Sequence, residues 1–143
     1  MLRFIADGIV ASYAGMAITI PSALLDQLFA HVDGSPDREV CGLLWGDEGR
    51  ITAVKPARNV AADPAATFEV DPQALIAALK AERQGGPRLI GHYHSHPNGD
   101  PSPSPRDLAA AEPGRLWLIV GGGEARLWFA EKATFREVDL VSV

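Results

Sequence analysis

Three of the four histidines in this chain lie close together in the sequence HYHSHP, residues 92–97. Apolar residues precede this sequence, so we predict a strand that ends at the proline, which lacks the backbone donor that a strand needs to continue. Side chains alternate along a strand, so His94 and His96 project to one side while Ser95 points away. Two imidazoles on one short piece of backbone can converge on a cation. We therefore interpret the stretch 89–108 as a metal site.

His92 lies on the same side of the predicted strand, but farther from His96. At a rise of roughly 3.3 Å per residue, the α-carbons of these two residues are about 13 Å apart. That separation is near the limit for two imidazoles that share an ion with Zn–N bonds of about 2.0–2.1 Å. We expect His94 and His96 to be the better pair of ligands, and the role of His92 stays open.

A catalytic zinc ion takes three protein ligands and keeps one open position, and Asp107 is the candidate for the third ligand. Ser104 and Pro105 have the types typical of an N-cap and a first helical position, which places Asp107 in the first turn of a helix. The same geometry leaves the Ser104 hydroxyl close to the metal, where it could donate a hydrogen bond to charge developing on a substrate oxygen. Capping and catalysis compete for this hydroxyl.

One spacing resembles the signature of the JAMM (MPN-plus) metalloproteases: His94-Ser95-His96, seven residues, Ser104, two residues, Asp107. The resemblance to this family extends over the chain from about residue 16 onward. That signature also requires an upstream glutamate just before a buried strand. Glu39, followed by VCGLLWG, has this form. The chain departs from the family pattern at position 92, where an aromatic or aliphatic residue is more usual.

The resemblance implies an α/β fold, a single-domain JAMM/MPN (cytidine-deaminase-like) mixed β-sheet flanked by helices. It implies one catalytic Zn²⁺ ion bound by His94, His96 and Asp107. Glu39 would be the general base that takes a proton from zinc-bound water as it attacks a carbonyl, and Ser104 a second catalytic residue. From its position alone, Glu39 could equally be a solvated loop carboxylate.

The function that the resemblance implies is that of a zinc metallopeptidase or isopeptidase. It would hydrolyse an amide bond at the C-terminus of a ubiquitin-like or sulfur-carrier protein, and release cysteine or C-terminal residues, as bacterial single-domain members do. Two alternatives are a non-catalytic MPN-type scaffold module, which a broken motif would indicate, and a RadC-like DNA-associated protein, which a basic surface would indicate. The motif is complete and the formal net charge is −5.

Length and composition indicate an ordinary globular protein. The 143 residues suit one domain, and 47% hydrophobic and 22% charged residues are a usual composition for a globular protein. The sequence has no basic stretch of the kind that binds nucleic acid. Cys41 is the only cysteine, which excludes an intramolecular disulfide and favours the cytoplasm. Asp7 and Gly8 interrupt the apolar N-terminal run, so we expect no membrane partner. We expect residues 1–15 to be a weakly ordered extension, residues 16–143 to be the metallohydrolase domain, and a homodimer to be possible.

Periodicity and turn residues predict the order of the secondary-structure elements. Helices are expected to begin at residues 22, 72 and 105, and residues 56–66 to form a loop. The remaining candidate residues are assigned structural roles: Cys41 and the three tryptophans in the core, His31 at a helix end, and Asp100 in a turn. The predicted strands are residues 17–20, 40–45, 50–54, 67–70, 89–96, 116–120, 125–130 and 135–143.

Overall fold

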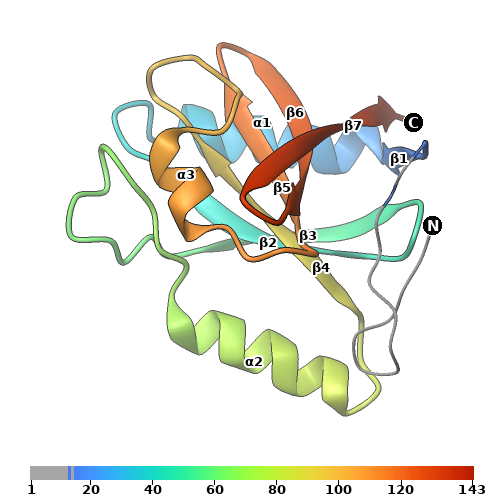
Figure 1. Cartoon of the computed structure of the whole chain (residues 1–143). Coiled ribbons are helices and arrows are strands. Elements are labelled where there is room, and N and C mark those ends of the chain that lie inside the picture. The colour runs from blue at the N-terminus through green and yellow to red at the C-terminus, as the bar shows by residue number, and fades with distance from the viewer. Residues whose placement is uncertain (1–12, 14) are drawn as a thin grey trace.

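The predicted histidine strand lies inside a mixed β-sheet of seven strands (Figure 1). The computed structural model describes residue 13 and residues 15–143. Within this part of the chain the strand order is β1-β7-β6-β5-β4-β2-β3, and three helices pack around the sheet. The strands are β1 (Ala17–Ile20), β2 (Cys41–Gly46), β3 (Ile51–Ala57), β4 (Leu89–Ser95), β5 (Leu116–Gly121), β6 (Glu124–Glu131) and β7 (Thr134–Ser142), and the helices are α1 (Ser22–Asp33), α2 (Pro72–Arg83) and α3 (Pro105–Ala110).

The sheet curls so that its two edge strands meet. β4 pairs in parallel with β5, and β1 with β7, while the other neighbours are antiparallel. The amide of Thr19 on β1 donates to the carbonyl of Gly49, which precedes β3, at 2.9 Å. This contact holds the edges together, so the concave face of the sheet encloses most of the apolar core.

Successive residues of β2 separate the two faces of the sheet. Leu44 packs into the main core, against which α1 places Leu24, Leu25 and Phe29. Leu43 points to the other face, where Leu89 and Ala78 of α2 form a second, smaller cluster. Apolar residues at helical spacing therefore bury one stripe of each helix, and the two helices cover opposite faces of the strand that carries the histidines.

The predicted elements agree with the structure except in two places. Residues 67–70 are not a strand, because only Val70 forms an isolated bridge to Asn59, whose side chain binds the backbone of Thr67 and Glu69 instead. The loop predicted from residue 56 begins later, since β3 continues through Pro56 to Ala57. Proline is tolerated there because β3 is an edge strand, where a backbone donor can be missing without breaking a ladder.

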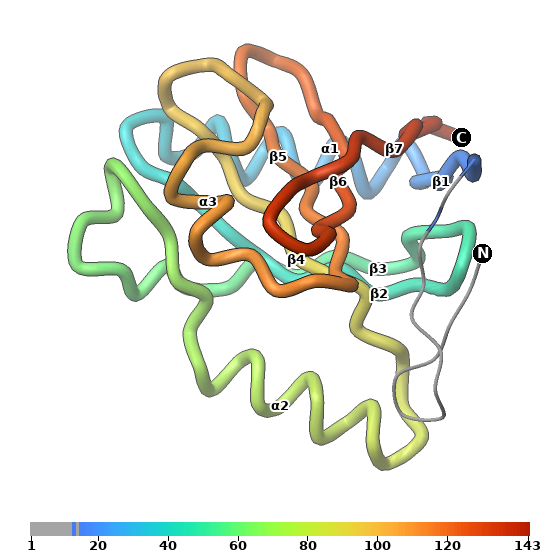
Figure 2. Tube along the Cα trace, in the orientation of Figure 1, coloured from blue at the N-terminus to red at the C-terminus, as the bar shows by residue number. Residues whose placement is uncertain are grey.

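Three connections gather at one end of the sheet. They join α1 to β2, β3 to α2, and β4 to α3, and Figure 2 shows them on the same side of the molecule. β4 ends at Ser95, immediately before the last of the clustered histidines and Pro97, as its sequence predicted. The candidate site residues are therefore delivered to one end of the sheet by three separate segments.

The expected N-terminal extension falls largely on residues 1–12 and 14, which lie outside the described residues. Tyr13 is described, and its ring packs edge-on against Phe129 with 5.5 Å between the ring centroids. Within the described part of the chain, every helix is too short or too polar to cross a membrane.

We predict that Gly91→Ala disrupts the pairing of β4 with β5. An added methyl group would collide with the backbone carbonyl of Leu116, which cannot move without breaking the parallel ladder. The expected loss in the free energy of unfolding is about 3 kcal/mol or more, measured by urea denaturation.

Gly49→Ala is the matched control for this substitution. A methyl group there meets no atom within 4 Å, so the change should stay within about 1 kcal/mol. Equal stability of Gly91→Ala and the wild type would contradict the register between β4 and β5.

Candidate metal centre

Two imidazoles and one carboxylate meet at the end of β4. The Nε2 atoms of His94 and His96 are 3.1 Å apart. Asp107 at the start of α3 places Oδ1 3.3 Å from Nε2 of His94 and Oδ2 3.0 Å from Nε2 of His96. All three side chains are buried, so the three residues that the motif nominates as metal ligands lie together away from solvent.

The spacing of these donor atoms fits a tetrahedral ion. Ligands bound at about 2.0–2.1 Å to a tetrahedral zinc lie about 3.3 Å from one another. The two Nε2 atoms are 3.1 Å apart, and each has a different oxygen of Asp107 at 3.0–3.3 Å. The donor set of two imidazole nitrogens and a carboxylate is also one that zinc accepts. The residues therefore fit the ion in size and in chemistry.

The hydrogen bond behind His96 supports the same conclusion. Its Nδ1 lies 2.7 Å from the carbonyl oxygen of Asp100, which can only accept, so Nδ1 carries the proton. In the neutral ring, Nε2 then presents a lone pair toward Nε2 of His94 and toward the carboxylate of Asp107. Acceptors facing acceptors need a proton or a cation between them. A backbone carbonyl behind a ligand imidazole is a common support for a metal site.

Glu39 stands beside the two imidazoles. One carboxylate oxygen of Glu39 and one ring nitrogen from each of His94 and His96 all lie within 4.8 Å of one another. The residue is 7% exposed, and its Oε1 atom has no hydrogen-bond partner in the described part of the chain. Burial raises the pKa of the Glu39 carboxyl to about 7, and the charge of Asp107 adds to this effect. The solvated loop carboxylate that the sequence left open is therefore not what the structure shows.

The other groups of the centre are shifted by burial and by one another. Burial lowers the pKa of His94 even though Asp107 opposes this. For Asp107, burial alone would raise the pKa, but in the metal-free centre hydrogen bonds accepted from the two histidine rings and from the Ser104 amide hold the pKa well below its usual range. Asp107 is thus ionised, and it presents a negative charge to whatever occupies the position between the imidazoles.

Ser104 caps α3 through a capping box. Its Oγ accepts a hydrogen bond from the Asp107 amide at 3.1 Å, and Oδ2 of Asp107 accepts from the Ser104 amide at 2.8 Å. The cap uses a lone pair of the hydroxyl and leaves its proton available, because a hydroxyl both donates and accepts. Capping therefore does not prevent this hydroxyl from donating a hydrogen bond, although the sequence predicted a competition between the two roles.

Two residues that the sequence did not single out position Glu39. Ser95 points away from the histidines, as alternation predicted, and its Oγ accepts from the Val40 amide at 2.9 Å. Asn59 donates from Nδ2 to the carbonyl of Glu39 at 2.8 Å. The alternation of β4 could have suggested Ser95, but Asn59 lies in a loop with no periodic pattern that would mark it.

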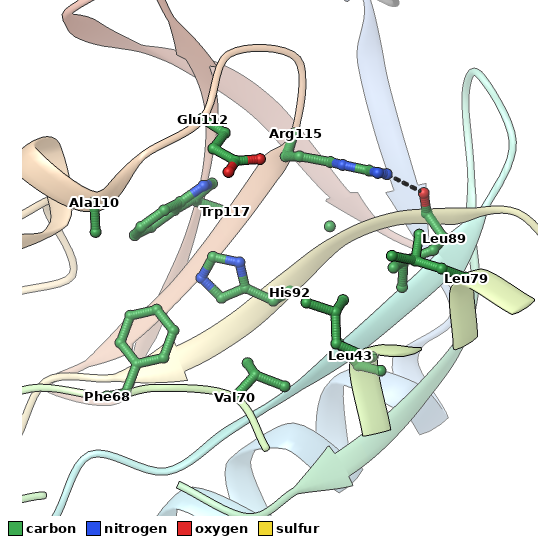
Figure 3. Close-up of a pocket in the computed structure, with 12 residues that line it drawn as sticks. Leu43, Phe68, Val70, Leu79, Leu89, His92, Ala110, Glu112, Arg115 and Trp117 are labelled. Atoms are coloured by element: carbon green, nitrogen blue, oxygen red, sulfur yellow. Dashed lines mark hydrogen bonds between the residues drawn. The ribbon is translucent and has the colours of Figure 1, made fainter. Parts of the chain in front are cut away.

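His92 lies outside this set of donors. It is half-buried, and its Nε2 atom is 3.3 Å from Nδ1 of His94, on the side of that ring away from the other ligands. It borders an apolar cavity of about 310 Å³ (Figure 3). Phe68, from the β3–α2 connection, stacks on His94 with 4.1 Å between ring centroids.

The residues assigned structural roles do not all lie in the core. Cys41 is fully buried, and burial raises the pKa of its thiol to about 12, which does not suit a nucleophile. His31, at the end of α1, has its Nδ1 2.6 Å from the Tyr93 hydroxyl. Trp117 is buried, whereas Trp45 and Trp128 are only partly so, and Trp128 donates to the carbonyl of Pro101 at 3.0 Å.

Several known proteins are similar to this chain. The family described as prokaryotic homologs of the JAB domain matches residues 21–132. The chain is 35% identical over 136 residues to the desampylase of Haloferax volcanii, with 91% of this chain and 96% of that protein covered. It is 34% identical over 134 residues to a Thermus thermophilus protein named "Probable TtuB-protein conjugate cleaving protease", with 94% of this chain and 88% of that protein covered. The solution structure of protein DSY2949 from Desulfitobacterium hafniense matches with a TM-score of 0.75 at 28% identity, over 88% of this chain and 92% of that one.

We predict that Glu39→Gln stabilises the fold above neutral pH in the presence of a chelator. The folded carboxyl has a pKa of about 7 instead of 4.5, so ionised Glu39 costs stability above pH 7 and nothing below about pH 4.5. Glutamine removes this cost, and the free energy of unfolding in urea should rise at pH 8 by on the order of 2–3 kcal/mol.

The comparison at pH 4 is the internal control, because both side chains are then neutral and the two proteins should unfold alike. Glu69→Gln is the matched variant, since Glu69 is exposed and its replacement should give no pH-dependent gain. A gain of equal size at both pH values would contradict a raised pKa as the cause.

Asn59→Asp should destabilise the protein by about 2–4 kcal/mol. The substitution keeps the acceptor used by the amides of Ala61 and Glu69, but turns a carboxylate oxygen toward the carbonyls of Glu39 and Thr67. Asn98→Asp is the matched control, because Asn98 uses only its Oδ1 acceptor, toward Asp100. Urea denaturation measures both, and equal stability of the two variants would contradict the role of the Asn59 donor.

Proposed function

This chain belongs to the family of prokaryotic JAB-domain homologues, as its motif predicted, and we propose that it hydrolyses an amide bond at the C-terminus of a ubiquitin-like or sulfur-carrier protein. It is a hydrolase of the JAMM type. The names of the two relatives described above support this substrate class, since one is a desampylase and the other is named "Probable TtuB-protein conjugate cleaving protease".

The observation that carries the proposal is the buried arrangement of four groups at one end of the sheet. His94, His96 and Asp107 lie together as a candidate ligand set, and Oε1 of Glu39 has no hydrogen-bond partner in the described part of the chain. A buried, unpartnered carboxyl costs stability. A role as general base explains why a protein retains such a carboxyl, whereas a purely structural role does not.

Each residue has a part in hydrolysis. A zinc ion held by His94, His96 and Asp107 would supply Lewis-acid polarisation of the scissile carbonyl and would lower the pKa of water. Glu39 takes the proton from the attacking water and gives it to the leaving amine nitrogen. One carboxylate can make both transfers in turn. The Ser104 hydroxyl donates its proton as a hydrogen bond to the negative charge that develops on the carbonyl oxygen.

The experiment is an intact-mass assay on a ubiquitin-like or sulfur-carrier protein with a C-terminal extension joined by an amide bond. Wild-type protein loaded with zinc should remove the extension. Glu39→Gln should bind zinc and be slower by roughly 10²–10⁴-fold, because only the proton transfers are lost. Asp107→Ala should lose both zinc and activity, since a ligand is removed; metal content is measured on the same samples.

Glu69→Gln is the control, because this exposed carboxylate lies outside the site. Cleavage by Glu39→Gln at the wild-type rate would refute the role of Glu39. A wild type that binds zinc but cleaves no substrate in a panel of such proteins would point to a binding function. A wild type that binds no zinc would refute the metallopeptidase altogether.

A further inference from the structure

The imidazole of His92 is directed at the back of a proposed metal ligand. Its Nε2 is 3.3 Å from Nδ1 of His94, while Nε2 of His94 faces Asp107 at 3.3 Å. His94 thus lies between His92 on one side and the ligand set on the other. Position 92 is also the one motif-adjacent position where the sequence departs from the family pattern.

The direction of this hydrogen bond decides what His94 can bind. If His94 carries its proton at Nδ1, it donates to His92 and leaves a lone pair at Nε2 toward Asp107 and His96. If the proton were on Nε2, it would point at the Asp107 carboxylate, and His94 could not bind an ion there. An acceptor behind Nδ1 selects the first tautomer.

We propose that His92 is a positioning residue for the metal centre: its Nε2 accepts a hydrogen bond from Nδ1–H of His94 and keeps the lone pair of His94 directed at the ion. This inference rests on the proposed function, because it takes His94 to be a ligand. His96 receives the equivalent support from the carbonyl of Asp100, at 2.7 Å. Both imidazoles of the ligand set therefore have an acceptor at Nδ1.

Packing fixes the orientation that this role requires. His92 pairs in register with Trp117 on β5, whose ring meets it edge-on with 4.3 Å between centroids. Phe68 also contacts the His92 ring, with 5.0 Å between centroids, and its own ring lies 5.8 Å from that of Trp117. Figure 3 shows the His92 ring beside these two side chains, at the cavity that Leu43 and Leu79 also line. These contacts hold the ring so that its Nε2 stays directed at His94.

Three variants test the proposal by their affinity for zinc, measured in competition with a chromophoric chelator. His92→Phe keeps an aromatic ring against Trp117 and Phe68 but has no acceptor, so zinc should bind about 10–100-fold more weakly. His92→Gln restores an acceptor through Oε1 and should bind close to the wild-type value. His92→Met has a similar length to glutamine but no comparable acceptor, and should resemble His92→Phe.

A merely structural role predicts the opposite order. If only packing mattered, phenylalanine and methionine would preserve zinc affinity in this apolar setting and glutamine would reduce it. ¹⁵N NMR of the histidine rings supplies a second readout: in the zinc-loaded wild type, Nε2 of His92 should be unprotonated and should accept the Nδ1–H of His94. The pair His92→Gln and His92→Met decides the question if His92→Phe does not fold.

Failure of this inference is distinguishable from failure of the proposed function. Wild-type affinity in both His92→Phe and His92→Met, with cleavage by the wild type intact, would overturn the role of His92 and leave the metallopeptidase standing. A wild type that binds no zinc, or a His92 protonated at Nε2 when zinc is bound, would overturn the inference; only the former also overturns the proposed function.

Discussion

The structure depends on one electrostatic constraint: four groups that accept hydrogen bonds are buried against one another at the end of β4. Two imidazole nitrogens and the carboxylate of Asp107 lie within 3.3 Å of each other, and Glu39 is beside them. Such a cluster is unfavourable in a low-dielectric interior unless something positive lies between its members. A cation satisfies all of them at once, whereas a proton can satisfy only one pair at a time.

The rest of the fold holds this unfavourable cluster in place. β4 has β2 on one side and β5 on the other, so the histidines sit on backbone that is hydrogen-bonded along both edges. Asp107 is held by the capping box of α3, and the segment around Glu39 by Ser95 and Asn59. Each charged or polar group thus has its backbone fixed by a neighbour that does not bind the ion. Side chains held in this way do not have to be reordered when a ligand arrives.

Much of this could be predicted from the sequence, for identifiable physical reasons. The strand that ends at Pro97 and the helix that begins at Ser104 are set by local rules, namely alternation, the missing donor of proline and the N-cap. Glu39 required the family resemblance, because a carboxylate in a loop has no local signature of burial. Asn59 and Phe68 could not be found, since their roles come from a loop of side-chain hydrogen bonds that replaces the predicted strand at residues 67–70.

In the proposed arrangement, the two ligand imidazoles are supported by different kinds of acceptor, and this difference would have consequences for the site. His96 is backed by the carbonyl of Asp100, and a backbone carbonyl is present whatever residue occupies that position. His94 is backed by a side chain, His92, which a single substitution can remove. Loss of a backbone acceptor requires the turn at residues 98–100 to change shape, whereas loss of His92 leaves the backbone untouched. The affinity of the centre can therefore be changed from the cavity side of His94 without disturbing the ligands or the base.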